Sequence, residues 1–345
     1  MLTAQLIAPR EFRIVEETLP PPAPGEVQVR VHSVGICGSD LHAATEGRVG
    51  DSPCQYPMVL GHEPSGTVAA LGGGVTGWSP GDRVALEPAV YCYHCEFCRS
   101  GRHNVCANIR FFSNPGLPGF FRQRMNLPAT NLLALPEGLA LEAATLIEPL
   151  AIALHSMKLA AIRTGETAAV FGAGPIGLLT IAWLKVAGAS RIFAVEPVAA
   201  RREMARHMGA GEALDPLQTD VVRDIRSATG GRGVDCAIDC AARDGTTNLA
   251  IRAACNGGRV ALTGIHSETM VPFEVSPMRR KELTILNVRR SNHESHDALR
   301  LLVDRIGWFA PLITHTRPLE GIAEAFRLNE RYEDGVGKLV IHAGG

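Results

Sequence analysis

A glycine turn between an apolar strand and an apolar helix decides how this chain folds: Gly172-Ala173-Gly174-Pro175-Ile176-Gly177. Residues 167–171 before the turn predict a buried strand, and the apolar residues after it, up to 187, predict a helix. A second strand, residues 191–195, leads into Glu196, about twenty residues after the turn. Such glycines let the backbone approach a pyrophosphate at a helix N-terminus, and the acid would hold a ribose hydroxyl group. In this context the pattern favours a dinucleotide site over an ordinary tight turn.

The same alternation of strands and helices continues toward the C-terminus. It predicts a doubly wound parallel sheet. The expected helices cover residues 198–208, 220–228 and 246–254, and the expected strands cover 234–239, 259–263 and 283–288. Two further helices, 296–306 and 319–329, and a last strand, 337–342, complete the chain.

The first third of the chain predicts β structure instead. Valines at 27, 29 and 31 alternate with polar residues, which is the two-residue period of a half-buried strand. Further strands are expected at 66–71 and 82–86. Short strands at this spacing are typical of a small barrel or sandwich.

Metal-binding side chains follow the first of these strands. The glycine-bounded stretch 35–42 carries Cys37, Ser39 and His42; His62-Glu63 comes some twenty residues later and Glu148 much later. Thiolate, imidazole and carboxylate form a donor set for zinc. Taken singly, a cysteine such as Cys37 is more often a buried thiol than a ligand, and His62-Glu63 fits a surface pair; the combination with the glycine turn downstream favours a metal.

A second set of cysteines has the spacing C-x2-C-x2-C-x7-C: Cys92, Cys95, Cys98 and Cys106. The short gaps turn successive thiolates toward one point, and the longer loop supplies the fourth corner of a tetrahedron. Four cysteines without an open position predict a closed, structural zinc site. The alternative is a cysteine-rich turn without metal.

Composition excludes several classes of function. The 345 residues carry a net charge of −1, which does not favour nucleic acid as a partner. Charged and polar residues interrupt the longest apolar stretch, 143–162, so no membrane span is expected. The N-terminus lacks the apolar segment of a signal peptide, and nine cysteines then favour metal ligands and free thiols over disulfides. A soluble cytoplasmic protein is expected.

The order of these motifs resembles the zinc-dependent medium-chain dehydrogenases, most closely the sorbitol (polyol) dehydrogenase branch. The resemblance runs essentially end to end. It implies an α/β protein with a GroES-like β-barrel catalytic domain, residues 1–150 and 290–345, carrying a zinc lobe at about 92–106. A Rossmann domain, residues 151–289, would bind NAD.

The resemblance also implies roles for individual residues. Cys37, His62 and Glu63 would bind the catalytic zinc, and Glu148 would lie beside it, bound directly or through water. Ser39 and His42 would form a proton relay. Cofactor contacts would come from Gly172, Gly174, Pro175, Ile176, Gly177, Glu196 and Arg201. Two zinc ions per chain and a homo-oligomer, a tetramer or dimer, are implied.

The expected reaction is hydride transfer between NAD and a secondary alcohol of a polyol or sugar derivative. Ala43 replaces an aromatic residue that is common in the family, and Arg289-Arg290 replaces an Arg-Tyr-like pair. Arg122 and Arg124 add further guanidinium groups. Such groups suit a carboxylate or phosphate on the substrate; the alternative is that these arginines are surface residues or form a subunit contact. A sugar acid, sugar phosphate or threonine-like amino alcohol is therefore an alternative substrate. A non-catalytic NAD-binding sensor is the remaining alternative.

Overall fold

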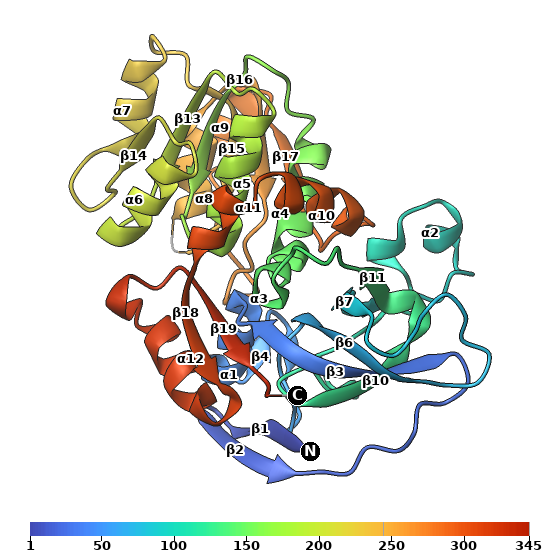
Figure 1. Cartoon of the computed structure of the whole chain (residues 1–345). Helices are drawn as coiled ribbons and strands as arrows, with labels where there is room; N and C mark the ends of the chain where they lie inside the picture. The colour runs from blue at the N-terminus through green and yellow to red at the C-terminus, as the bar shows by residue number, and fades with distance from the viewer. Residues whose placement is uncertain (244, 345) are drawn as a thin grey trace. The chain divides into compact units, whose positions relative to one another are not determined.

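The computed structural model describes residues 1–243 and 245–344, and the chain folds into two compact units (Figure 1). Unit 1 comprises Met1–Glu148 and Ser295–Gly345, and unit 2 comprises Pro149–Glu294. Residues 244 and 345, which fall within the expected domains, lie outside the described residues.

Unit 1 is built on a mostly antiparallel sheet with the strand order β11-β7-β6-β3-β19-β18, in which β10 also pairs with β3. The predicted alternation holds in β3, where Val27, Val29 and Val31 are buried while Arg30 and His32 are exposed. The strands are β1 (Leu2–Ala8), β2 (Glu11–Glu16), β3 (Glu26–Gly35), β4 (Arg48–Val49), β5 (Ser52–Pro53), β6 (Glu63–Leu71), β7 (Arg83–Leu86), β8 (Ala89–Val90), β9 (Arg110–Phe111), β10 (Arg124–Pro128), β11 (Leu132–Ala134), β18 (Ile313–Pro318) and β19 (Lys338–His342).

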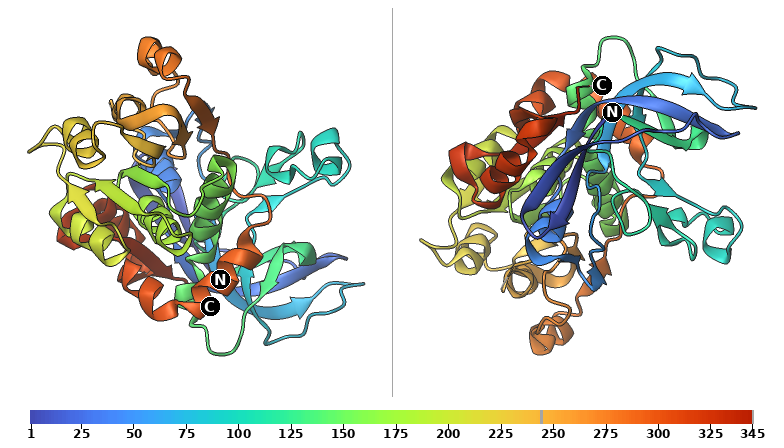
Figure 2. Two further views of the ribbon diagram at one scale, coloured as in Figure 1. Left: turned by 90° about the horizontal axis from the view of Figure 1, so that it is seen from above. Right: turned by 90° about the horizontal axis from the view of Figure 1, so that it is seen from below.

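The C-terminal strand returns to the N-terminal sheet. β19 pairs with β3 through Val340 opposite Gly35 and Ile341 opposite Val34, so the C-terminal strand completes the sheet that begins with β3 (Figure 1). The helices of this unit are α1 (Gly38–Glu46), α2 (Glu96–Arg99), α3 (Leu141–Ala144), α10 (Ser295–Asp304), α11 (Ile306–Phe309) and α12 (Ile322–Glu330). The lobe that carries α2 projects from the rest of unit 1 in both views of Figure 2.

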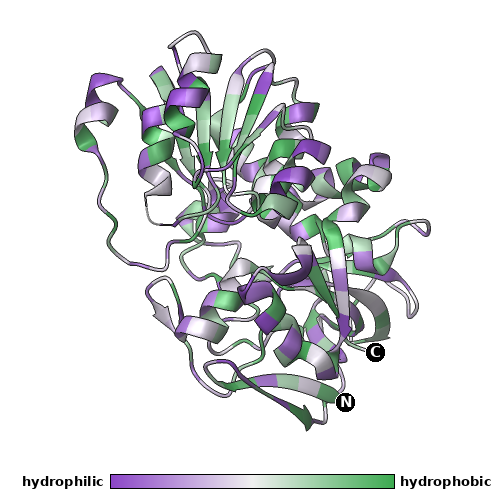
Figure 3. Ribbon diagram, turned by 90° about the vertical axis from the view of Figure 1, so that its left-hand side faces the viewer, coloured by the Kyte–Doolittle hydropathy of each residue, from purple (hydrophilic) through white to green (hydrophobic). Residues whose placement is uncertain are grey.

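Unit 2 is a parallel sheet with the order β14-β13-β12-β15-β16-β17. Its strands are rich in apolar residues, as the green colouring of Figure 3 shows, because helices cover both faces of such a sheet. The strands are β12 (Thr167–Phe171), β13 (Arg191–Val195), β14 (Glu212–Leu214), β15 (Val234–Asp239), β16 (Ala254–Leu262) and β17 (Thr284–Asn287). The helices are α4 (Ile147–Ala160), which begins in unit 1, α5 (Pro175–Val186), α6 (Ala199–His207), α7 (Val221–Ala228), α8 (Thr246–Ala253) and α9 (Val275–Arg280).

The strand order of unit 2 reverses between β12 and β15, which is where doubly wound sheets bind their ligands. The glycine turn lies at the carboxyl end of β12 and leads into α5. A Cβ atom at Gly177 would overlap the carbonyl oxygen of Gly172, so the close passage of helix and strand requires glycine there. Within the described part of the chain, no helix is both long and apolar enough to cross a membrane.

Candidate active site

The sheet register of unit 1 brings the predicted zinc ligands together. Gly35 at the end of β3 lies opposite Glu63 at the start of β6, so Cys37 and His62 are placed around the same point. One ligand atom from each of Cys37, His62 and Glu63 lies within 4.8 Å of the others. His62 and Glu63 are buried, and Cys37 is partly exposed. Two of the three candidate ligands are therefore shielded from solvent, and the thiol of Cys37 is the more accessible one.

Asp40 orients these ligands, although the sequence did not single it out. Its buried carboxylate accepts hydrogen bonds from the backbone N–H groups of Cys37 (3.1 Å) and Gly61 (3.2 Å), and His62 Nδ1 lies 3.3 Å from Oδ1. Burial alone would raise the pKa of Asp40, but His62 and these N–H groups hold it below its ordinary value. A carboxylate on Nδ1 leaves Nε2 as the metal-binding atom of His62. The signal in the sequence was an acid three residues after Cys37, at the start of a helix.

Lys338 is the second residue missing from the predicted site. Its buried ammonium group forms an ion pair with Glu63 and donates a hydrogen bond to the carbonyl oxygen of Ile36 at 3.0 Å. Both side chains are 1% exposed. A Cβ atom at Gly35 would overlap the Glu63 carboxylate, so glycine at this position makes room for the pair.

The donor set fits a zinc ion. The two carboxylate oxygens of Glu63 and Nδ1 of His62 are buried without a well-directed hydrogen bond, although Lys338 and Asp40 lie at ion-pair distance from them. Burial would lower the pKa of His62, yet Asp40 and Cys37 raise it well above its ordinary value. The field of these groups therefore stabilises a positive charge at this point, and thiolate, imidazole and carboxylate are zinc ligands.

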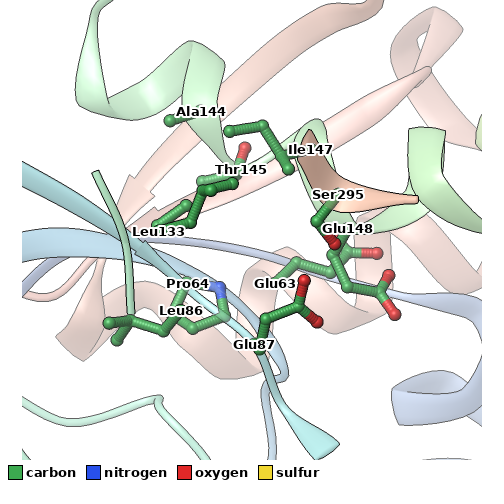
Figure 4. A pocket seen from close by; sticks show the side chains of 11 residues that line it. Glu63, Pro64, Leu86, Glu87, Leu133, Ala144, Thr145, Ile147, Glu148 and Ser295 are labelled. Carbon is green, nitrogen blue, oxygen red and sulfur yellow. The ribbon is translucent and has the colours of Figure 1, made fainter. Parts of the chain in front are cut away.

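Glu148 faces a small cavity in unit 1 with a volume of about 10 Å³, enough for about one water molecule (Figure 4). Glu63 and Glu87 line the same cavity, and Figure 4 shows all three carboxyl groups around it. Burial of its carboxyl group, opposed by His62 and reinforced by Glu63, raises the pKa of Glu148 to about 8. The structure thus places Glu148 beside the predicted ligands, where a water molecule fits.

The two predicted relay residues lie on α1. Ser39 Oγ is 3.5 Å from His62 Nε2, at the long limit of a hydrogen bond. His42 lies one turn further along the helix, where its Nδ1 contacts Glu46 Oε1 at 2.7 Å. Ser39 is therefore at the ligand cluster, and His42 lies on the side of the helix that leads toward solvent.

The four lobe cysteines also converge. Their sulfur atoms lie within 4.8 Å of one another. The backbone N–H groups of Cys95 and Cys98 point at the sulfurs of Cys92 and Cys95, at 3.4 and 3.5 Å. The backbone N–H of His94 is the main cause that lowers the pKa of Cys92 to about 5. Amide donors around sulfur favour thiolates, the form that binds zinc.

Comparison with known proteins agrees with this geometry. Residues 23–137 match the alcohol dehydrogenase GroES-like domain, and residues 175–304 match the zinc-binding dehydrogenase domain. The chain is 33% identical to a sorbitol dehydrogenase from Bacillus subtilis strain 168, over 96% of this chain and 94% of that protein. The chain is a zinc-dependent medium-chain dehydrogenase.

Solved structures support the same conclusion for this dehydrogenase. Galactitol-1-phosphate dehydrogenase from Escherichia coli superposes with a TM-score of 0.90 at 28% identity, covering 99% of this chain and all of that one (100%). An Escherichia coli protein described as a short chain alcohol dehydrogenase, complexed with NADH, gives 0.90 at 31% identity and 99% coverage of both chains. The predicted fold class, the oxidoreductase activity on alcohols, and the cofactors zinc and NAD are confirmed.

The predicted NAD contacts of the dehydrogenase surround the glycine turn in unit 2. Glu196 is buried after β13, and its carboxylate accepts hydrogen bonds from the backbone N–H groups of Ala173 (2.8 Å) and Val198 (2.9 Å). Each carboxylate oxygen keeps a second lone pair for a ribose hydroxyl group. Arg201 is buried on α6, with Nη1 about 4.0 Å from where a Cβ atom of Gly174 would lie. The turn, the acid and the guanidinium thus lie close together.

A buried acid that the sequence did not indicate holds the neighbouring loops of the dehydrogenase. The Asp239 carboxylate, at the end of β15, accepts hydrogen bonds from the Ala242 backbone (2.9 Å) and from Thr247 Oγ1 (2.6 Å). Thr247 Oγ1 in turn contacts His266 Nε2 at 3.2 Å. The loops after β15 and β16 are therefore tied together at the carboxyl edge of the sheet. Arg289 and Arg290 follow β17 at this same edge.

Two of the arginines considered for substrate recognition have partners within the fold of unit 1. Arg122 is buried and forms an ion pair with Glu17, and Arg124 donates a hydrogen bond to Gln28 at 3.4 Å. These guanidinium groups connect β-strand segments of unit 1 and are used by the fold.

Proposed function

We propose that this dehydrogenase transfers a hydride between NAD and a secondary alcohol of a polyol or sugar derivative. The observation that carries the proposal is the convergence of Cys37, His62 and Glu63 within 4.8 Å in a largely buried site. These three residues would hold the catalytic zinc, and Glu148 would lie beside it, bound directly or through water. A bound zinc ion lowers the pKa of a coordinated water from about 15.7 to about 7, and an alcohol is a similarly weak acid.

The chain's own residues then supply orientation and a proton path. Asp40 and Lys338 hold His62 and Glu63 in place. Ser39, next to His62, would take the hydroxyl proton of the substrate and pass it to His42, which lies toward solvent. Cys92, Cys95, Cys98 and Cys106 would bind the second, structural zinc ion.

Unit 2 would be the NAD domain and unit 1 the catalytic domain. In this assignment Gly172, Gly174, Pro175, Ile176 and Gly177 cradle the pyrophosphate at the start of α5. Glu196 would hold the ribose hydroxyl groups and repel the 2′-phosphate of NADP, because like charges at this distance are unfavourable. Arg201 would contact the adenosine end.

A sugar acid or sugar phosphate is the second candidate substrate. Arg290 adopts φ 55°, a left-handed conformation that costs a residue other than glycine about 1–2 kcal/mol. Strain of this kind collects at functional sites, and the strained residue follows β17 at the carboxyl edge of the sheet. Arg289 and Arg290 together would match a carboxylate or phosphate.

The dehydrogenase is further proposed to be a cytoplasmic homo-oligomer, a dimer or tetramer. All nine cysteines are free thiols, which suits a reducing compartment. Apolar side chains stand exposed in the segment between β16 and the edge strand β17: Ile265, Met270, Phe273 and Val275, with Met270 at 86%. A sheet edge and an apolar patch together favour contact with another chain. Light scattering on the purified protein gives the number of chains.

An NAD-reduction assay over polyols, sugar acids, sugar phosphates and L-threonine tests the proposal. Turnover of a polyol with zinc, lost on chelation, is expected. Preference for an acid or phosphate that disappears in Arg289→Ala or Arg290→Ala supports the second candidate. A protein that binds NAD and zinc but oxidises no alcohol of the panel would be a sensor, and the proposal would fail.

A further inference from the structure

Glu46, the last residue of α1, contacts the histidine of the proposed proton path. Its Oε1 lies 2.7 Å from His42 Nδ1, four residues earlier on the same helix. The two side chains are 16% and 30% exposed, with the carboxylate the more accessible. The imidazole of His42 is therefore largely shielded from solvent, and the carboxylate of Glu46 is the more accessible of the two groups.

The contact determines which ring nitrogen carries the proton. A carboxylate can only accept, so a hydrogen bond at 2.7 Å requires a proton on Nδ1 of His42. In the neutral ring the lone pair then lies on Nε2, which is the atom able to accept a proton. We propose that Glu46 is a positioning residue that holds His42 in its proton-accepting tautomer. This inference rests on the proposed role of His42 in the proton relay.

Helix stability gives a poor account of Glu46. A carboxylate in the last turn of a helix meets the negative end of the helix dipole, and α1 carries no lysine or arginine in that turn. The favourable order for a helical ion pair places the acid before the base, whereas here His42 precedes Glu46. Gly47, with φ 69°, already ends the helix. An acidic residue that stabilised α1 would therefore be expected at its N-terminal end.

The proton balance of the step is simple. His42 Nε2 gains the proton that arrives through Ser39, and the imidazolium is held by the Glu46 carboxylate. The Nδ1 proton then leaves to Glu46 or directly to water, and one proton reaches solvent for each hydride transferred to NAD. The starting tautomer returns when Nδ1 regains a proton from Glu46 or water and Nε2 loses its own proton to water, so the net release stays one proton.

The test compares Glu46→Gln, Glu46→Met, His42→Ala and the double variant His42→Ala/Glu46→Gln. Glu203→Gln is the matched control, because Glu203 also pairs along a helix surface, with Arg206 in unit 2. Sorbitol, or the alcohol of the panel with the fastest turnover, serves as substrate. Stopped flow with a pH indicator follows proton release, and NADH absorbance follows hydride transfer. Zinc content and the thermal midpoint of each variant are measured separately.

We expect kcat to fall about threefold to tenfold in Glu46→Met and less in Glu46→Gln, whose amide oxygen still accepts the Nδ1 proton. Proton release should slow by the same factor, while KM for NAD, zinc content and the thermal midpoint stay unchanged. In the His42→Ala background Glu46→Gln should have no further effect, because residues that act through one another are not additive.

Three results overturn the inference, and they differ in whether the proposed proton relay fails with it. If His42→Ala slows turnover but both Glu46 variants behave like Glu203→Gln, Glu46 has no positioning role and the proton relay stands. The same holds if Glu46→Gln has an equal effect with and without His42. If His42→Ala itself turns over at the wild-type rate, the relay is wrong and the inference fails with it.

Discussion

Lys338→Met tests how the buried site of unit 1 is held together. The substitution keeps the length of the apolar stem but removes the ammonium group that pairs with Glu63 and bonds to Ile36. Both partners are 1% exposed, so solvent cannot replace the lost charge. Breaking a buried ion pair in this way costs about 3–5 kcal/mol. For a unit of this size that corresponds to a thermal shift of roughly 6–20 °C.

The shift should depend on the metal. In chelator-treated protein the Glu63 carboxylate has lost the ammonium group that pairs with it, and the full loss is expected. In zinc-loaded protein the metal supplies the missing positive charge, so the loss should be less than half as large. Scanning calorimetry of both forms measures this difference, with the transition of unit 1 separated from that of unit 2.

Lys158→Met is the matched control, because the Lys158 side chain is 71% exposed and its pair with Glu294 lies at 3.2 Å. The Lys158 ammonium group stays in water and the buried Glu294 keeps His155 at 3.2 Å, so the loss should be about 0–1 kcal/mol and the shift a few degrees at most. A loss below about 1 kcal/mol in zinc-free Lys338→Met, equal to that of the control, would refute the account of a charge-balanced buried site.

Three further predictions follow from single contacts. Asp40→Asn keeps the shape of the side chain but removes its charge, and should weaken zinc at the site of His62 about 10–100-fold in a chelator competition, with lobe zinc retained. Hydrogen bonds from His155, Asn292 and Lys158 outweigh burial and hold the pKa of Glu294 at about 2. Because this lies below the unfolded value of 4.5, the stabilisation is present above pH 4.5 and disappears as the pH falls toward 2. Glu294→Gln should therefore cost about 1–2 kcal/mol in urea unfolding at pH 7, after allowance for solvent screening, and almost nothing near pH 2; equal losses at both would contradict this. Glu196→Ala should raise KM for NAD and reduce discrimination against NADP, and unchanged kinetics with both cofactors would remove that assignment.

Local patterns predicted much of this molecule, because the elements concerned are decided by nearby residues. The alternation of Val27, Val29 and Val31 predicted β3, and the glycine turn predicted the β12–α5 junction. Cys37, His62 and Glu63 could be recognised as a zinc donor set because their residue types are rare in combination.

Contacts between segments that lie far apart in the chain could not be predicted from the sequence. Lys338 meets Glu63 only because β19 pairs with β3, a register that no local period reveals. A lysine directly before the apolar run of β19 was the available signal, since such a residue is seldom buried without a partner. The role of Arg122, substrate contact or surface residue, stayed open for the same reason: its partner Glu17 lies far away in the chain. Glu46 shows a further limit, because an acid four residues after a histidine is common on helix surfaces.

Zinc analysis of Cys37→Ser beside wild type tests the central claim most directly, with Cys54→Ser as a control for the loss of a thiol outside both clusters. About two zinc ions per chain are predicted for wild type and for Cys54→Ser. Cys37→Ser should keep about one, held by the four lobe cysteines, and should no longer reduce NAD with any alcohol. Full zinc content together with full activity in Cys37→Ser would contradict the proposed catalytic centre.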